Sequence, residues 1–169
     1  SVDHEAVGLG DFGKTGDYIA RQVARWSKQY QASETEKIEA MDNLIAWLPA
    51  NVPPGDETRI VHGDYRIDNV IFHPTEPRVL AIMDWELSTI GDPLADFAYH
   101  LMMYRISTAS IPGLRGRDVM ELGLAPESEY VAAYCARRGL DEFPNLDFYM
   151  TFCMFRLAAI FHGIRGRVA

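Results

Sequence analysis

Polar side chains able to support a transfer reaction gather in one short segment, His62-Gly63-Asp64-Tyr65-Arg66-Ile67-Asp68-Asn69. Asp64 could take a proton from a hydroxyl group, and the amide oxygen of Asn69 could bind a divalent cation. A further carboxylate, Asp84, stands 15 residues after Asn69, directly behind an apolar run. A base beside hard oxygen ligands suits the transfer of a highly charged group to a hydroxyl, because the cation neutralises charge while the carboxylate orients the nucleophile.

Three short runs of apolar and β-branched residues flank this segment and predict the strands that would hold it. They cover residues 59–62, 69–72 and 79–83, and a turn at 74–77 would join the last two. We expect all three strands to be buried. Asp64 and Asn69 would then lie between the first two strands, with Asp84 directly after the third. Rigid elements would thus bring the polar side chains together.

The residues before this segment predict two helices. Apolar residues recur at helical spacing over residues 19–30. Ser33 and Glu36 have the spacing of a capping box, and an apolar face over residues 38–48 follows them. We therefore expect the second helix to begin at this box and to end before the Pro-Pro-Gly at 53–55.

Three more helices are expected after it. Asp92-Pro93 can serve as the N-cap and first position of one helix, and Pro126 and Gly139 bound another. Asn145 could cap a last helix that runs through about His162. Because this helix is apolar almost all round, we expect it at the centre of a helical bundle. The predicted fold class is mainly α with a small β insert (α+β).

The composition is that of a globular protein and excludes some function classes. The chain has 169 residues, 48% of them hydrophobic, which is enough for one domain with a sizeable core. The net charge is −8, and residues 1–100 hold 17 acidic but only 8 basic side chains. A nucleic-acid surface needs basic residues, so we expect no nucleic-acid partner. The acidic part would suit a metal site, or a cationic or neutral substrate.

The cysteines and the apolar runs indicate in which cellular compartment the protein is expected. Cys135 and Cys153 lack the spacing of a zinc site, and we expect them to be buried free thiols. This favours a reducing, cytoplasmic location. The start of the chain has no signal-peptide pattern, and the most apolar run, residues 148–161, is shorter than the roughly 20 residues that span a membrane. We therefore expect no membrane partner.

The run VHGDYRIDNVIFHP, followed by VLAIMDWELSTIGDPLADFAYHL, resembles the aminoglycoside phosphotransferase and choline kinase family, which has the protein-kinase-like fold. Its pattern His-x-Asp-x-Arg-x-x-Asn is that of a kinase catalytic loop. The chain is most similar to the bacterial "phosphotransferase enzyme family" members related to the kinase-like domains fused to acyl-CoA dehydrogenases. This likeness extends over most of the chain, including GLGDFG near the start and the helix from Arg25 to Tyr30.

The resemblance implies roles for the polar residues. Asp64 is expected to be the catalytic base, and Asn69 and Asp84 are expected to bind magnesium and, through it, the cofactor. Arg66 takes the place of the kinase Lys that supports the transferring phosphate, and its charge is permanent.

Three further residues are expected to support the site. His62 would orient the loop, and Asp96 would hydrogen-bond the backbone of the loop. Glu86 would orient the metal site or touch the substrate.

The activity that the resemblance implies is ATP- and Mg²⁺-dependent transfer of the γ-phosphoryl group to a hydroxyl of a small molecule. The substrate could be an aminoglycoside, an amino alcohol, a sugar or a hydroxyacyl compound. The dehydrogenase-linked relatives favour a hydroxyacyl compound, whereas the acidic first part favours an amine.

Two other functions remain open. A non-catalytic kinase-like nucleotide-binding or regulatory module would not need an intact set of Asp64, Asn69 and Asp84. A metal-dependent hydrolase could use His62, Asp64 and Asp84 as ligands, although such sites usually have more His and carboxylate ligands.

A complete kinase of this type has an N-terminal lobe with a phosphate-covering loop and a strand Lys paired to a helix Glu. Neither is found: the glycines of residues 8–13 precede a helix, and Lys14, Lys28 and Lys37 lie in or beside helices. We expect residues 1–169 to form a single domain, the C-terminal lobe, with the N-terminal nucleotide-binding lobe absent. We expect that missing lobe to be a partner, and the chain alone to turn over ATP poorly.

Arg156 is the one charged residue in the apolar run 148–161 and needs a partner there. We expect it to form a buried salt bridge or to anchor an anionic group of the substrate. Tyr99 is expected in the core or in a pocket wall.

Overall fold

The computed structural model describes residues 2–55, 57–108 and 111–168, with five α-helices and four short strands among them. The strands form two separate antiparallel pairs, β1 with β4 and β2 with β3. This α+β arrangement agrees with the predicted class. The elements in chain order are α1 (Tyr18–Ala32), α2 (Glu39–Ala50), β1 (Arg59–Val61), β2 (Val70–Phe72), β3 (Val79–Ile82), β4 (Thr89–Gly91), α3 (Pro93–Leu101), α4 (Glu127–Arg138) and α5 (Leu146–Val168).

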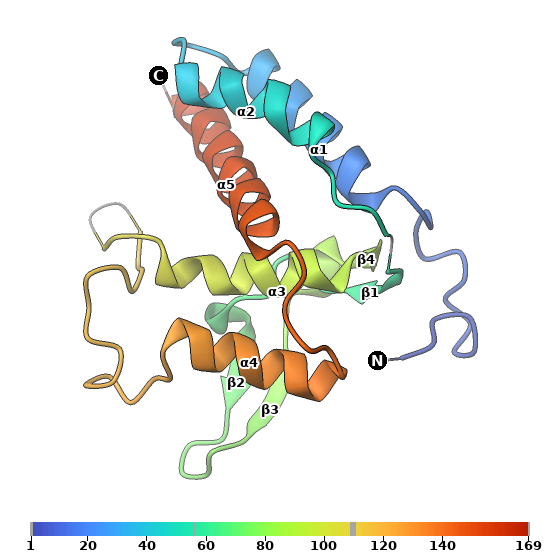
Figure 1. Cartoon of the computed structure of the whole chain (residues 1–169), viewed down its shortest axis with the longest axis vertical. Helices are drawn as coiled ribbons and strands as arrows, with labels where there is room; N and C mark the ends of the chain where they lie inside the picture. The colour runs from blue at the N-terminus through green and yellow to red at the C-terminus, as the bar shows by residue number, and fades with distance from the viewer. Residues whose placement is uncertain (1, 56, 109–110, 169) are drawn as a thin grey trace.

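The long helix α5 is the centre of the core, as its all-round apolar character predicts. It packs against α3, α1 and α2, and Figure 1 shows it running from α3 up to the first two helices. Phe152 and Phe155 are almost fully buried in it. The helix continues to Val168 rather than ending near His162, because His162 faces the core and its Nε2 accepts the Thr35 N–H at 3.2 Å.

Helices α1 and α2 confirm one prediction and correct another. The apolar stripe of α1 is buried as predicted. The capping box is wrong: the hydroxyl of Ser33 donates to the carbonyls of Gln29 and Tyr30, at 3.0 and 3.2 Å. The last carbonyl groups of α1 lack helical partners and accept the Ser33 hydroxyl, so this side chain is not available to cap α2. Helix α2 begins after Ile38, which offers no side-chain cap.

The first sheet contains a strand that was not predicted. Strand β4 pairs with β1 so that Arg59 lies opposite Gly91 and Val61 opposite Thr89. It is only three residues long and ends in glycine, so it has no apolar run to reveal it. Gly91 fits there because a Cβ atom would lie 2.8 Å from the side chains of Tyr18 and Val61. Close packing of α1 on the sheet therefore requires glycine at this position.

The second sheet, the β2–β3 hairpin, is more exposed than predicted. Phe72 is 53% exposed and Val79 is 49% exposed, so the prediction of buried strands is wrong for this pair. Figure 1 shows the hairpin reaching away from α1 and α2, at the opposite end of the molecule. An apolar run indicates a strand, but it does not indicate whether another element covers that strand.

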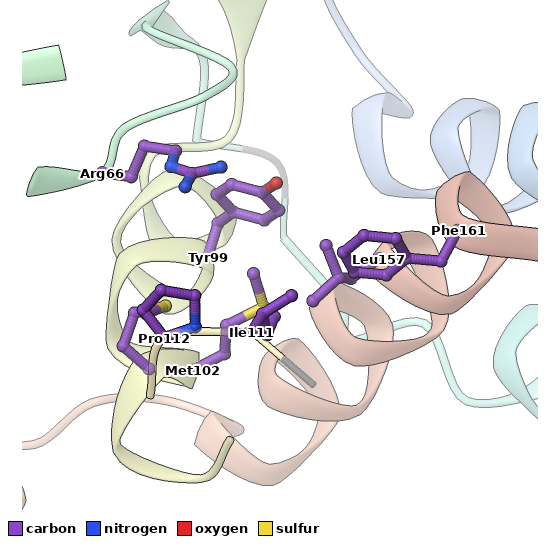
Figure 2. Close-up of a pocket in the computed structure, with 8 residues that line it drawn as sticks. Arg66, Tyr99, Met102, Ile111, Pro112, Leu157 and Phe161 are labelled. Atoms are coloured by element: carbon purple, nitrogen blue, oxygen red, sulfur yellow. The ribbon is translucent and has the colours of Figure 1, made fainter. Parts of the chain in front are cut away.

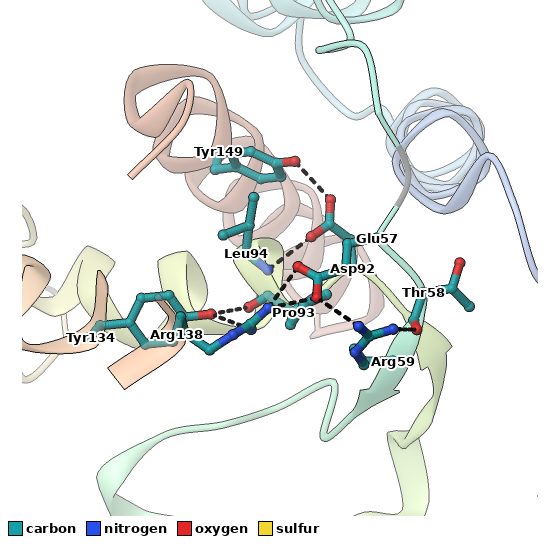
Figure 3. A network of polar contacts seen from close by, with 9 residues as sticks. All are labelled: Glu57, Thr58, Arg59, Asp92, Pro93, Leu94, Tyr134, Arg138 and Tyr149. Carbon is teal, nitrogen blue, oxygen red and sulfur yellow. Dashed lines mark hydrogen bonds and ion pairs between the residues drawn. The ribbon is translucent and has the colours of Figure 1, made fainter. Parts of the chain in front are cut away.

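Helix α3 is fixed at its first residue by a buried polar network, shown in Figure 3. Asp92 accepts the Leu94 N–H at 2.8 Å, as the predicted N-cap, and also accepts the Tyr149 hydroxyl at 2.7 Å. Arg138 at the end of α4 pairs with Glu57 at 2.6 Å, just ahead of β1. Burial raises the pKa of Asp92, and its hydrogen bonds oppose that shift. The network ties α3 to α5, and α4 to the start of β1.

Other predictions on helices and cysteines are also settled. Helix α4 begins after Pro126 and ends at Gly139, as predicted. Cys135 and Cys153 are buried free thiols.

Of the helices that the structure describes, not one combines the length and apolar character that crossing a membrane would require. The expected loop over residues 107–117 includes Ala109 and Ser110, which lie outside the described residues.

Candidate active site

The segment from His62 to Asn69 forms the loop between β1 and β2, and a sharp turn at Gly63 opens it. Gly63 has φ = 82°, a left-handed conformation that favours glycine. A Cβ atom at this position would collide with the main-chain carbonyl of Leu87. The glycine in the His-Gly-Asp sequence is therefore a steric requirement of the turn that precedes Asp64.

His62 joins the start of this loop to the end of β3. Its side chain is buried; the Asp64 N–H points at Nδ1 at 3.3 Å, and Nε2 lies 2.7 Å from the Met83 carbonyl. Because Nδ1 accepts a hydrogen bond, the ring proton is on Nε2 and is donated to Met83. The ring of Trp85 also packs on the imidazole, with centroids 4.7 Å apart. His62 thus fixes the geometry of the loop from inside.

Asp96, on α3, holds the same turn from the other side. Its carboxylate accepts the N–H groups of His62 and Gly63 at 2.7 and 3.0 Å. This is the backbone contact that the sequence predicts for it. Burial raises the pKa of Asp96, while these two hydrogen bonds and the nearby charge of Arg156 oppose the shift. The N-terminal half of α3 therefore positions the turn.

Asp64 and Asn69 face each other across the loop. The side-chain amide of Asn69 donates to the Asp64 main-chain oxygen at 2.9 Å and to its carboxylate at 3.3 Å. Tyr99 of α3 lies close to Asp64. Burial raises the pKa of Tyr99, and the charge of the neighbouring Asp64 adds to this. The half-buried carboxylate is therefore hydrogen-bonded by Asn69 and has Tyr99 of α3 as a neighbour.

Asp84 is brought to the same place through its neighbour Met83. The Met83 N–H donates to the main-chain oxygen of Asn69 at 2.8 Å, and its carbonyl binds His62. Asp84 itself is exposed and has φ = 65°, a conformation that non-glycine residues rarely adopt and that recurs at functional sites. The end of β3 is therefore fixed to the loop, and among the described residues the exposed carboxylate of Asp84 has no hydrogen bond or ion pair.

The oxygens at this position suit a hard divalent cation. The amide nitrogen of Asn69 donates to Asp64, which leaves its amide oxygen available, and the Met83 N–H ties the residue before Asp84 to the main chain of Asn69. The residues that the structure describes include no cluster of three or more His, Cys, Asp or Glu side chains that could hold a metal. Two protein oxygens fit an ion such as Mg²⁺, which usually keeps water and phosphate oxygens among its ligands.

Arg66 and Glu86 lie to the side of this assembly. Arg66 is exposed and pairs with Asp68 in the same loop. Glu86 is exposed in the short 3₁₀ helix Trp85–Leu87, and among the described residues it has no hydrogen bond or ion pair with the other site residues. The structure thus gathers His62, Asp64, Asn69 and Asp96, places Asp84 next to them, and leaves the two remaining predicted residues at the rim.

A pocket opens beside the loop at Arg66 and adds residues that no motif indicated. It has a volume of about 280 Å³, and Figure 2 shows Tyr99 standing between Arg66 and the apolar side chains of α5. Tyr99, expected in the core or in a pocket wall, is buried and lines it. The lining residues are Arg66, Tyr99, Met102, Met103, Ile111, Pro112, Leu157 and Phe161.

Arg156 also lies next to the loop, and of its two predicted roles the structure tests only the buried salt bridge. Among the described residues it forms no ion pair, so the expected salt bridge is wrong. It donates instead to the main-chain oxygen of Gly63 at 2.7 Å. A charged residue in an apolar helix signalled a special contact, but its partner is a carbonyl that no sequence pattern could identify.

Comparisons with known proteins agree on a single group. The Phosphotransferase enzyme family matches residues 1–149. Acyl-CoA dehydrogenase family member 10 of Mus musculus is 51% identical over 170 residues, and family member 11 of Rattus norvegicus is 44% identical over 171 residues. Each match covers 99% of this chain, but only 16% and 22% of those proteins.

A solved structure has nearly the same fold. The crystal structure of a candidate aminoglycoside phosphotransferase from Ralstonia eutropha superimposes with a TM-score of 0.94 at 52% identity. The match covers 99% of this chain and 51% of that one. The chain therefore spans about half of this solved relative and about a fifth of the two dehydrogenase family members.

Proposed function

The chain belongs to the Phosphotransferase enzyme family, as its motifs predict, and we propose that it carries the catalytic loop of an ATP- and Mg²⁺-dependent enzyme that phosphorylates a hydroxyl of a small molecule. One observation carries the proposal. Asp64 is held by the side-chain amide of Asn69, at a loop that also binds the end of β3 ahead of Asp84. A base and two oxygen ligands for a cation are thus fixed to one another.

The proposed role of Asp64 is to orient the attacking hydroxyl and to accept its proton. The hydrogen bonds from Asn69 support this role, because they restrict the orientation of Asp64 before a substrate arrives. Asn69 and Asp84 would hold Mg²⁺, which supplies positive charge to the phosphate oxygens. Arg66 would add a permanent charge if it turns from Asp68 towards the transferring group.

The pocket supports a substrate with an apolar body. Among the described lining residues Arg66 is the only charged one, and methionine, isoleucine, proline, leucine and phenylalanine side chains form most of the wall. Such a wall would disfavour a polycationic aminoglycoside and would accept a neutral or anionic compound. Two relatives are named as acyl-CoA dehydrogenase family members, which agrees with an acyl group. We therefore favour a hydroxyacyl compound over an amine, although the acidic first part of the chain would suit an amine.

We further propose that the chain is the C-terminal lobe of a kinase-like fold and that the nucleotide lies between it and the rest of a longer protein. Two observations support this. The match covers about half of the solved relative, and the β2–β3 hairpin exposes apolar side chains such as Phe72 and Leu80 beside the catalytic loop. A second lobe would cover that face.

An acceptor screen tests the proposal. The natural full-length protein is incubated with ATP and Mg²⁺ and with hydroxyacyl-CoAs, amino alcohols or aminoglycosides, and ADP and the phosphorylated product are measured. We expect transfer to a hydroxyacyl compound, loss of transfer when EDTA removes the metal, and a much lower rate from residues 1–169 alone. Nucleotide binding without transfer to any acceptor would instead favour a non-catalytic module, and equal activity of residues 1–169 would refute the two-lobe arrangement.

A further inference from the structure

Arg156 lies in α5, outside the part of the chain that matches the family, and it is in an unusual environment. Its guanidinium packs over Tyr99 and Trp26, at 4.6 and 5.3 Å from their ring centroids. Its buried Nε has no hydrogen-bond partner among the described residues. Keeping a partly buried cation without a paired carboxylate is unfavourable for folding, so its position calls for a reason other than stability.

The contact that Arg156 makes controls one peptide group of the catalytic loop. Its Nη2 donates to the Gly63 carbonyl at 2.7 Å, and the N–H on the other side of that peptide bond, from Asp64, points at His62 Nδ1 at 3.3 Å. Both polar atoms of the Gly63–Asp64 peptide are therefore held by side chains. Because a peptide group is planar, fixing its oxygen and its N–H fixes the direction in which the chain enters Asp64.

The same guanidinium reaches the other support of Asp64. The ring face of Tyr99 lies against the Arg156 guanidinium, and Tyr99 is also close enough to Asp64 for the carboxylate charge to raise its pKa. Arg156 is thus in contact with the main chain that leads into Asp64 and with a side chain next to the Asp64 carboxylate. It does not line the described pocket, so it reaches the reaction only through these neighbours.

We propose that Arg156 is a positioning residue, which holds the Gly63–Asp64 peptide and Tyr99 so that the Asp64 carboxylate points at the acceptor hydroxyl. This rests on the proposed phosphotransferase function. Misplacing a catalytic group by about 1 Å can lower a rate by about 100-fold. Loss of Arg156 should therefore lower kcat by about 10- to 100-fold. KM for ATP and for the acceptor should change little, because Arg156 would touch neither.

Arg25 provides a matched control. Its guanidinium lies over the ring of the same Trp26, also at 5.3 Å, but it is exposed on α1 and does not contact the loop. In the full-length protein, Arg156→Met and Arg25→Met are compared for kcat, KM and amide hydrogen exchange over residues 62–69. We expect the first variant alone to lose kcat and to exchange faster in the loop. Arg156→Lys keeps a charge and a hydrogen-bond donor, so its kcat should be at least about threefold higher than that of Arg156→Met.

Four outcomes would overturn the proposal. These are a parental kcat in a folded Arg156→Met protein, an equal loss in Arg25→Met, a raised acceptor KM in place of a lowered kcat, and no recovery in Arg156→Lys. If Arg156→Met does not fold, Arg156→Lys decides. The proposal then requires a kcat at least about threefold below the parent with faster loop exchange, because a shorter, non-planar group replaces the guanidinium. If the parent transfers no phosphoryl group, the proposed function fails, yet the exchange measurement still tests whether Arg156 holds the loop.

Discussion

Individual residues around Asp64 each have one identifiable task. His62 and Arg156 hold the two polar atoms of the peptide ahead of it, and Asp96 binds the amides of the turn. Asn69 holds its side chain, and Tyr99 lies close to it. Such an arrangement fits a group whose direction matters more than its flexibility. It also explains why the sequence pattern names His, Asp and Asn but is silent on an Arg that lies 93 residues after Gly63.

Asp96 should contribute more to the stability of the folded protein in mildly acidic solution than at neutral pH, which is unusual for a carboxylate. Because burial raises its pKa, the folded protein binds a proton more readily than the unfolded chain in mildly acidic solution. Its contribution to the free energy of unfolding should therefore rise as the pH falls from neutral, through the raised folded pKa, towards the unfolded value of about 3.9.

Urea unfolding at several pH values can measure this effect. The difference in free energy of unfolding between the parent and Asp96→Asn should grow as the pH falls from about 7 to about 4.5. Asp118→Asn, a change at an exposed turn, controls for the substitution itself. A parent–Asp96→Asn difference that shrinks as the solution becomes more acidic would show that the folded-state pKa is lowered instead.

At the scale of elements, α3 links the core to the catalytic loop. Its first residues are held by Asp92, its middle carries Asp96, and its outer end carries Tyr99. The helix is anchored on α5 through the bond from Tyr149 to Asp92. A change at this anchor should therefore reach the loop even though it lies outside it.

Asp92→Ala should destabilise the protein by about 2–4 kcal/mol. Loss of the N-cap costs about 1 kcal/mol, and loss of the buried hydrogen bond between the Tyr149 hydroxyl and the carboxyl group costs about 1.5–3 kcal/mol. Asp118→Ala removes a similar cap at an exposed turn and should cost much less, about 0.5 kcal/mol. Denaturant unfolding of both variants at neutral pH measures the two costs, and equal values would contradict the importance of the network.

The sequence predicted elements better than it predicted their surroundings. The stripe of α1, the cap of α3 and the all-apolar α5 could be predicted because periodicity and end residues determine them locally. The sequence did not predict strand β4, because three residues are too few to show an alternating apolar pattern. It assigned Ser33 to the wrong helix, because the end of α1 and the start of α2 compete for the same hydroxyl. The exposure of the hairpin depends on what packs against it, which no local pattern records.

For the molecule as a whole, the site lies within the residues that match the family, whereas the pocket also draws on α5 beyond them. The loop and α3 supply Asp64, Asn69 and Asp96, all within the residues that match the family. The far wall of the pocket, with Leu157 and Phe161, comes from the second half of α5, beyond that match. The proposed chemistry would therefore be shared with the family, while the choice of acceptor would depend on α5.

The central claim, that Asp64 is the base of a phosphoryl transfer, is tested most directly by a single-turnover measurement on the full-length protein. Enzyme in excess is saturated with Mg²⁺·ATP and mixed with the acceptor found in the screen, and the phosphorylated product is followed in the parent, Asp64→Asn and Asp118→Asn. We predict that Asp64→Asn binds ATP as tightly as the parent but transfers about 10²- to 10⁴-fold more slowly, with Asp118→Asn unchanged. A parental transfer rate in Asp64→Asn would contradict the claim.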